Sequence, residues 1–384
     1  MNESEFEILI RGGENTRLQF KKNLTNANAL ALELIAFSNS LGGQIIIGVD
    51  DEGDVIGLSG DDISRINQLL SNAASENYVP PIYPVSDIFE FENKKVMIIK
   101  VPCGANKPYA TKDGRFITRS GADKRMISND EMRRLFQESG KLLAEETPVK
   151  GGNWDDIDSE YFLEFYKNKY DEELKKTDIP RAFENLNLAS DGSFNLCGSY
   201  LFGKNNIPRL FIGNQIICIS FFGKDLAGSD YRDSANIDGN LKKLFEEGRA
   251  FIARNIKRIQ NGKNFNSVGD PEIPMPVIDE LFANALLHRD FFVSGNIRIG
   301  IFDDRIEIIS PGALPNHLTI DNIKKGVSIK RNPTICSFAS DIIPYRGIGS
   351  GILRALKIYP KIEFENNTDI NFFKATIYRP GDNI

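Results

Sequence analysis

The sequence predicts an α+β protein built from two or three domains. Its 384 residues exceed one domain of ordinary size. Short β-branched runs alternate with segments of helical periodicity, without an internal repeat. Proline and glycine cluster at 145–153 and 271–276, which indicates two boundaries. We therefore expect an α+β domain over 1–145, a mixed α/β connecting region over 154–268 and a further α/β domain over 270–384.

The N-terminal part combines helical and strand patterns. Apolar residues at helical spacing predict a helix over 27–41, which Gly42 and Gly43 end. The β-branched run 44–49 predicts a short strand. Further strands are expected at 95–101 and 115–118, followed by a closing helix at 129–137.

The rest of the chain is also mixed. In the middle region we expect a helix over 157–169, a strand-rich stretch over 210–222 and a long helix over 237–257. No catalytic constellation occurs there, so a packing and connecting role is the simplest interpretation. After the second proline cluster the sequence predicts a helix, a hairpin of strands 296–302 and 305–309, a glycine-rich turn with a short helix, and a final strand at 372–378.

The bulk composition argues against several classes of protein. Hydrophobic residues make up 41% and charged residues 26%, which is ordinary for a soluble chain. No apolar run approaches the roughly 18 residues of a membrane span, and the acidic start lacks the layout of a signal peptide. The net charge of −6 argues against a nonspecific coat on nucleic acid but leaves room for a local basic face. We expect a cytoplasmic protein without membrane contact, whose reduced cysteines and two histidines form no zinc site: Cys103, Cys197, Cys218, Cys336, His288 and His317.

A polar stripe runs along the helix after the second proline cluster. Glu280, Asn284 and His288 lie at i, i+4 and i+8, which places them on one helix face. The Asn284 oxygen suits Mg²⁺, a hard cation that prefers oxygen ligands. The Glu280 carboxylate can orient or deprotonate a water aimed at a γ-phosphate. The alternative is a surface helix with scattered polar residues, and for His288 alone that alternative is favoured.

A glycine-rich run opens a later helix. Gly347, Gly349 and Gly351, with Ser350 between them, let the backbone approach phosphate oxygens. The helix N-terminus adds free N–H groups and a favourable dipole. Taken alone, such a run is as often a plain turn, but after the polar helix and the hairpin it indicates a nucleotide site.

Together with FDDRIEIISPGALP at 302–315 and RNP at 331–333, these motifs resemble the GHKL ATPase superfamily, which includes gyrase B subunits, MutL and sensor histidine kinases. Within it they are most similar to the RecG-like C-terminal ATP-binding domain. The resemblance implies an α/β sandwich with the Bergerat fold that binds ATP and Mg²⁺, with Glu280 as the water-activating base and Asn284 as the Mg²⁺ ligand. It also implies further contacts: His288 on the same helix, Gly312, Leu314 and Pro315 at the adenine edge, Lys330, Arg331 and Asn332 in a loop over the phosphates, Gly347, Gly349, Ser350 and Gly351 around the phosphates, and Thr376 on the last strand.

The chain departs from that superfamily at one position. Most members carry an Asp-x-Gly-x-Gly motif whose aspartate receives the adenine amino group, whereas Ser310 stands at that place here. Ser310 can accept a hydrogen bond but carries no charge. The sequence therefore specifies phosphate binding more strongly than base selectivity.

Four N-terminal segments follow one another in order: GGENTRLQFKKN, ALELIAFSNSLGG, QIIIGVDDEGDVIGL and FITRSGADKRMISNDEMRRLF. They resemble the Schlafen-type AlbA-like domain, which implies binding to DNA. This domain is commonly joined to the RecG-like ATP-binding domain, and LCGSYLFGK at 196–204 fits that architecture.

Nuclease members of the Schlafen group bind a divalent metal through two glutamates five residues apart and a later aspartate. The matching positions here are Glu14, Gln19 and Asp50. Gln19 is neutral and ligates a metal more weakly than a carboxylate does, so Glu14 and Asp50 form at most a vestigial metal site. We expect binding of nucleic acid without cleavage.

Basic residues near these positions indicate a face that contacts phosphates. Arg17, Lys21 and Lys22 flank the motif, and the stretch 100–134 carries nine Lys or Arg against four acids. Within this stretch we expect three residues to contact nucleic acid: Arg119, Lys124 and Arg125. A second basic run contains Arg249, Arg254, Lys257, Arg258 and Lys263. The alternative for each run is a solvated surface.

The sequence therefore predicts a prokaryotic regulator that binds ATP and DNA or RNA, acts in transcription regulation and assembles as a homo-oligomer. Mg-ATP at the C-terminal domain would control nucleic-acid contact by the N-terminal domain. The main alternative is a Schlafen-like metal-dependent nuclease gated by ATP, in a defence system. A third interpretation is an ATP-driven clamp whose N-terminal domain only oligomerises. The chain has no GxxxxGK[ST] motif, which argues against helicase activity.

Overall fold

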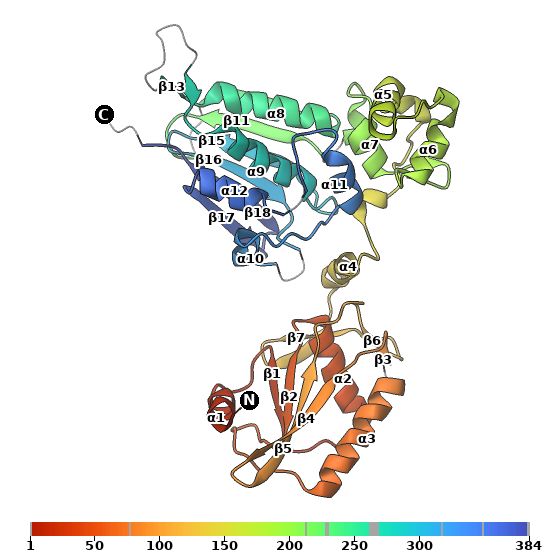
Figure 1. Cartoon of the computed structure of the whole chain (residues 1–384), viewed down its shortest axis with the longest axis vertical. Coiled ribbons are helices and arrows are strands. Elements are labelled where there is room, and N and C mark those ends of the chain that lie inside the picture. The colour runs from red at the N-terminus through yellow and green to blue at the C-terminus, as the bar shows by residue number, and fades with distance from the viewer. Residues whose placement is uncertain are drawn as a thin grey trace. The chain divides into compact units, whose positions relative to one another are not determined.

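The computed structural model shows a mixed α+β protein, which confirms the predicted fold class. It describes residues 2–76, 78–211, 213–226, 230–260, 269–315, 318–347 and 349–381. His317, Lys263 and the end of the expected middle region at 261–268 lie outside these ranges. The chain divides into two compact units, Met1–Leu142 and Leu143–Ile384 (Figure 1).

The first unit is built on a sheet with the strand order β1-β2-β5-β4. Only β1 and β2 run parallel, and the other neighbours are antiparallel. Its elements are α1 (Glu3–Arg11), β1 (Leu18–Lys21), α2 (Ala27–Asn39), β2 (Gly43–Ile47), α3 (Gly60–Glu76), β3 (Tyr78–Val79), β4 (Val85–Phe91), β5 (Lys94–Val101), β6 (Ala110–Thr111), β7 (Ile117–Ser120), β8 (Asp123–Met126) and α4 (Asn129–Glu138).

The central strand β2 is buried on both faces, which explains its continuous apolar run. Ile45 and Ile47 pack into the core that includes α2. Ile46 points to the other face and packs with Phe6 of α1. Helix α2 ends at Asn39, two residues before the predicted end, and the chain turns at Gly42, which has φ +68 and where a Cβ would lie 2.5 Å from the backbone nitrogen of Cys103.

The second unit is built on a larger sheet with the strand order β12-β11-β15-β16-β18-β17. Strand β11 runs parallel to β15, and the other neighbours are antiparallel. Its main elements are η1 (Ala144–Glu146), α5 (Ser159–Tyr170), α6 (Ile179–Asn185), α7 (Leu196–Phe202), β11 (Ile216–Phe221), β12 (Tyr231–Ile237), α8 (Leu241–Asn255), α9 (Met275–Leu287), β15 (Ile297–Ile301), β16 (Arg305–Pro311), α10 (Ile320–Lys324), α11 (Pro333–Ala339), α12 (Gly351–Ile358), β17 (Ile362–Asn367) and β18 (Phe372–Tyr378). Shorter pieces are η2 (Trp154–Asp156), η3 (Lys176–Asp178), β9 (Ala189–Ser190), β10 (Ser193–Phe194), η4 (Pro208–Phe211), β13 (Arg258–Ile259) and β14 (Asp270–Pro271). No described helix has the length and apolar character needed to cross a membrane.

The expected connecting region over 154–268 is not a separate unit. Its strand β11 pairs with β15, and its helix α8 packs against α9. Gly248 makes that helix contact close, since a Cβ on it would lie 2.4 Å from the ring of Phe282. The apolar stretch of β11 can be buried only beside a strand that comes about 80 residues later, which a local pattern does not reveal.

Helix α9 is buried along most of its circumference, by residues such as Leu281 and Leu286. It packs against the sheet at β16 and against α8 and α12 (Figure 1). The stripe that carries Glu280 and Asn284 is less buried than the rest of the helix. This stripe positions the site described below.

Glu145 fixes the start of the second unit to α11. Its carboxylate has no solvent exposure and accepts hydrogen bonds from the backbone nitrogens of Thr334 and Ile335, both at 2.8 Å. Burial raises the pKa of this carboxyl group, and the two backbone bonds oppose that effect. Since α11 follows the loop that contains Arg331, Glu145 links the beginning of the unit to that loop.

Candidate functional site

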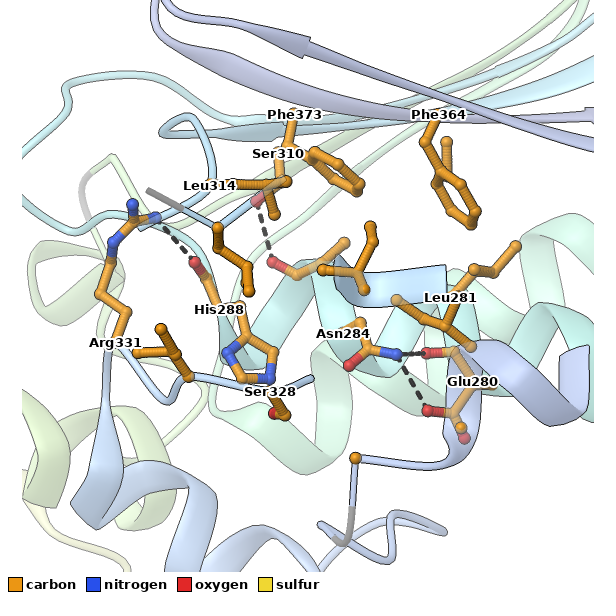
Figure 2. Close-up of a pocket in the computed structure, with 18 of the residues that line it drawn as sticks. Glu280, Leu281, Asn284, His288, Ser310, Leu314, Ser328, Arg331, Phe364 and Phe373 are labelled. Atoms are coloured by element: carbon orange, nitrogen blue, oxygen red, sulfur yellow. Dashed lines mark hydrogen bonds between the residues drawn. The ribbon is translucent and has the colours of Figure 1, made fainter. Parts of the chain in front are cut away.

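A cavity that is partly open to solvent lies between α9 and one face of the sheet (Figure 2). Helix α9 contributes Glu280, Leu281, Asn284, Ala285 and His288. Strands β16, β17 and β18 contribute the side chains Ile308, Ser310, Phe364, Phe373 and Ala375. The loops on the open side contribute Gly312, Leu314, Pro315, Val327, Ser328, Arg331, Tyr345, Arg346, Gly347 and Gly349, among others, and helix α12 contributes Gly351 and Arg354.

Glu280 and Asn284 form a hydrogen-bonded pair at one end of this cavity. The Asn284 amide nitrogen donates to the Glu280 carboxylate at 2.9 Å and to the Glu280 backbone oxygen at 2.8 Å. Its carboxamide oxygen points away from Glu280 (Figure 2) and has no hydrogen bond to any described residue. Glu280 therefore fixes the amide with an oxygen left to bind a hard cation.

His288 lies one turn further along α9. Burial, with help from the cations Arg331 and Lys330, lowers the pKa of His288 from 6.5 to about 4. The ring is therefore neutral at pH 7. Its Nε2 lies 3.4 Å from the hydroxyl of Tyr345. The backbone oxygen of His288 accepts a hydrogen bond from Arg331 at 3.0 Å, which ties the end of α9 to the facing loop.

The glycine-rich turn is tightly packed at the cavity mouth. Gly347 and Gly349 have φ +67 and +74, and a Cβ on Gly349 would lie 2.8 Å from the backbone oxygen of Gly326. A Cβ on Gly351 would lie 1.6 Å from the Glu280 carboxylate. Helix α12 starts at this point, and its N-cap Ser350 makes no side-chain capping bond. The first N–H groups of α12 are thus left for an anion.

Cationic side chains surround the same region. Arg331 donates to the backbone oxygens of His288 and Ala313, at 3.0 and 2.6 Å. Arg346 is exposed on the cavity wall and makes no ion pair with a described residue. Arg354 makes an ion pair with Glu280 at 3.3 Å. The residues that line the cavity include one acidic side chain, Glu280, and the three arginines Arg331, Arg346 and Arg354. The lining therefore carries a net positive charge, which suits a phosphorylated ligand.

The sheet side of the cavity is apolar. The rings of Phe364 and Phe373 are stacked with centroids 5.8 Å apart and planes 20° apart. Ser310 lies beside them and donates its hydroxyl proton to the backbone oxygen of Ala285 at 3.0 Å (Figure 2). Because its one proton is used, Ser310 offers only lone pairs to a ligand. The wall can thus hold a flat ring next to one hydrogen-bond acceptor.

Several cavity residues were missed by sequence reasoning: Tyr345, Arg346, Arg354, Phe364 and Phe373. The aromatic pair comes together only through the pairing of β17 with β18, where Asn366 is opposite Phe373 and Phe364 opposite Ala375. Arg346 and Arg354 flank the glycine motif, and that position was the one available signal for them.

Four residues expected around the ligand lie outside the cavity lining, and one of them is Ser350, between the lining residues Gly349 and Gly351. Asn332 is fully buried, and its amide donates to the backbone oxygens of Leu287 and Arg289, both at 2.9 Å, so it fixes the loop. Thr376 lies opposite Glu307 and Glu363 on the other face of the sheet, because neighbouring strand residues alternate in direction. Lys330 is exposed and outside the lining, although it is close enough to lower the pKa of His288. Ile348 in the glycine run lies outside the described residues.

In the first unit, Gln19 joins Glu14 to Arg119. The Gln19 amide donates to Glu14 at 2.6 Å and accepts from Arg119 at 2.7 Å. Glu14 also accepts from the backbone nitrogen of Phe20 at 2.6 Å. The carboxylate of Asp50 accepts a hydrogen bond from the backbone nitrogen of Asp54 at 2.8 Å. Among the described residues, no group of three or more His, Cys, Asp and Glu could hold a metal ion.

Arg119 is not available to nucleic acid, contrary to expectation. Its side chain has no exposure, it pairs with the buried Glu33 at 3.5 Å, and its guanidinium lies 4.3 Å from the ring centre of Phe37. Burial lowers the pKa of the guanidinium, and Glu33 opposes this. Lys124 pairs with the same Glu33 at 2.6 Å.

The other expected contacts differ in how free they are. Arg125 makes two hydrogen bonds to Glu131, at 2.7 and 2.5 Å. Arg17 and Lys22 are exposed, and Lys21 is half-buried. Lys22 has a loose ion pair with Asp50 at 3.8 Å. Among the expected contacts, the positive charges least engaged by acids are therefore those of Arg17, Lys21 and Lys22.

Two family models match the chain, one in each unit. Residues 14–128 match the family described as "Schlafen, AlbA_2". Residues 294–377 match the family described as "Putative ATP-dependent DNA helicase recG C-terminal". The second match begins after α9, so the assignment of Glu280, Asn284 and His288 rests on their geometry in the cavity.

Solved structures give more distant matches. The DIP2311 protein from Corynebacterium diphtheriae is 17% identical, with a TM-score of 0.46, over 98% of this chain and 80% of that chain. The N-terminal domain of a RecG-related protein from Nitrosomonas europaea is 23% identical, with a TM-score of 0.25, over 34% of this chain and 96% of that chain. No curated protein sequence matches this chain.

Proposed function

We propose that this chain, which carries a Schlafen AlbA_2 domain and a RecG C-terminal-type domain, binds ATP in the second unit and nucleic acid through the first. It would act as a cytoplasmic regulator of transcription in which Mg-ATP controls contact with DNA or RNA. The observation that carries the proposal is the convergence of Asn284, the open N-terminus of α12 and three arginines on one cavity.

The residues of the cavity fit a nucleoside triphosphate. The N–H groups at the start of α12 and the side chains of Arg331 and Arg346 would hold the phosphates. The free oxygen of Asn284 would hold Mg²⁺, which supplies charge neutralisation at the phosphates when bound. The base would lie on the wall of Phe364 and Phe373.

Ser310 supports adenine as the base. Its hydroxyl proton is engaged by Ala285, so the oxygen accepts a hydrogen bond from an exocyclic amino group. A carbonyl oxygen in the same place, as in guanine, would meet an unfavourable pair of acceptors. Ser310 thus offers the adenine amino group a hydrogen-bond acceptor whose orientation is fixed, where an aspartate would offer a charged acceptor.

Glu280 supports hydrolysis in this site. Its carboxylate lies against the start of α12, beside the place proposed for the phosphates. There it can position an attacking water and accept its proton.

The nuclease alternative receives no support from the first unit. A metal site needs carboxylates free to ligate, whereas Glu14 is bound by Gln19 and by a backbone nitrogen, and Asp50 holds its own turn. The exposed Arg17 and Lys22, together with the half-buried Lys21, favour contact with phosphates instead.

The decisive experiment is calorimetric titration of the full chain with ATP, with and without Mg²⁺. Asn284→Ala should lose the Mg²⁺-dependent part of the affinity because it removes the oxygen ligand. Asn236→Ala is a matched control, since Asn236 is exposed on the edge strand β12. Equal affinities for wild type and Asn284→Ala in a folded protein would refute the site. A gel shift with DNA and RNA, with and without Mg-ATP, then tests the regulatory part.

A further inference from the structure

The carboxylate of Glu280 lies beside the place where the geometry would put an anionic ligand. It lies so close to the start of α12 that no Cβ fits on Gly351, the distance being 1.6 Å. A helix N-terminus attracts anions, and here one of the protein's own carboxylates lies next to it. A triphosphate that approaches α12 must therefore come close to a resident negative charge.

One cation is positioned to cancel that charge. Arg354 lies in the first turn of α12 and lines the cavity, and its Nη2 lies 3.3 Å from the second carboxylate oxygen of Glu280. The first oxygen is bound by the Asn284 amide at 2.9 Å. Glu280 is 13% exposed and Arg354 41% exposed, so solvent reaches the pair mainly from the arginine side.

The other cations of the cavity make different contacts. Arg331 donates to the backbone oxygens of His288 and Ala313. Arg346 has no ion pair with a described residue. In the described part of the chain, the ion-pair partner of Glu280 is Arg354.

We propose that Arg354 is a positioning residue that makes Glu280 compatible with the triphosphate, by neutralising the carboxylate and holding it at the start of α12. The inference rests on the proposed function, since it concerns the same nucleotide site. Without Arg354, the carboxylate repels each phosphate that enters, so the loss of affinity grows with the number of phosphates. Without the negative charge of Glu280, Arg354 has nothing to neutralise, and its removal costs little.

The test is a double-mutant cycle on the full chain, read by calorimetric titration with Mg-ATP, Mg-ADP and AMP. Arg354→Met should weaken ATP binding by about tenfold or more, ADP binding less and AMP binding hardly at all. Arg354→Lys keeps the charge and should recover most of the affinity. In a Glu280→Gln background, Arg354→Met should change ATP affinity less than about twofold. Arg346→Met is the matched control, and its effect should be the same with Glu280 or Gln at position 280.

Circular dichroism and thermal melts on each variant separate loss of fold from loss of binding. If Arg354→Met costs the same in both backgrounds, Arg354 binds phosphate directly or only supports the fold, and the inference is overturned. If it costs nothing in either background, the inference is overturned as well, while the proposed function stands. If the wild type binds none of the three nucleotides, the proposed function fails, and the inference fails with it.

Discussion

His288 gives a prediction whose size follows directly from the structure. Burial lowers its pKa from 6.5 to about 4, so between these values the unfolded chain binds a proton that the folded chain does not. The stabilising contribution is complete above about pH 6.5 and is lost as the pH falls toward 4. One pKa unit corresponds to about 1.4 kcal/mol, so the loss amounts to about 3 kcal/mol for the second unit.

The measurement uses His288→Gln, which removes the titrating ring. Urea unfolding of both proteins at pH 7.0, 6.0, 5.0 and 4.0 isolates the contribution of His288 as the difference between their unfolding free energies. That difference should shift against the wild type by up to about 3 kcal/mol from neutral to acid pH.

A direct check is available because the chain has two histidines in all. In a proton NMR titration, the His288 resonance, identified by its absence in the variant, should stay unprotonated down to about pH 5. A midpoint near 6.5 for that resonance, or an unfolding difference that does not change with pH, would refute the burial argument.

Two further predictions concern stability and nucleic-acid contact. Glu145→Ala leaves two backbone N–H groups of α11 without an acceptor and should lower the unfolding free energy of the second unit, measured in urea, by about 3 kcal/mol or more. The control Glu146→Ala, at an exposed position, should change it by less than about 0.5 kcal/mol. Equal effects of the two variants would show that the Glu145 carboxylate does not stabilise the start of α11. Joint replacement of Lys21 and Lys22 by Ala should lower the slope of log binding constant against log salt concentration by about 0.7–0.9 per lost phosphate contact. Arg125→Ala should change this slope less, because the Arg125 guanidinium is hydrogen-bonded to Glu131. A larger change for Arg125→Ala than for the double lysine variant would place the binding face elsewhere.

The sequence predicted what local periodicity controls. The four-residue spacing of Glu280, Asn284 and His288 set them on one face of α9, and the structure brings all three to the same cavity. The strand predicted at 372–378 has those bounds in β18, since an apolar run between turns defines its own ends.

Features that depend on partners far along the chain were not predictable in the same way. The excess of positive charge over 100–134 is largely balanced by acids outside that window, such as Glu33 and Asp87. Arg119 is buried because it bonds to Gln19, a hundred residues earlier. Thr376 is one position away from the cavity-facing Ala375, and strand parity alone turns it to the other side.

Gln19 shows why loss of one carboxylate has consequences beyond metal binding. As an amide it donates to Glu14 and accepts from Arg119, two interactions of opposite polarity that a carboxylate cannot make at once. Gln19→Glu would keep the bond to Arg119 but set two carboxylates against each other at the present 2.6 Å contact. A divalent cation between them is the simplest way to relieve that repulsion.

We therefore expect Gln19→Glu to lower the melting temperature of the first unit in EDTA and to recover part of the loss with Mn²⁺, while the wild type does not respond to Mn²⁺. Weak Mn²⁺-dependent cleavage of DNA or RNA by this variant, but not by the wild type, would show that one carboxylate separates binding from cutting. Robust cleavage by the wild type that disappears in Glu14→Ala would instead make the nuclease interpretation the correct one. Unchanged melting of Gln19→Glu in EDTA would mean that Glu14 moves away freely and that the amide bridge contributes little to the fold.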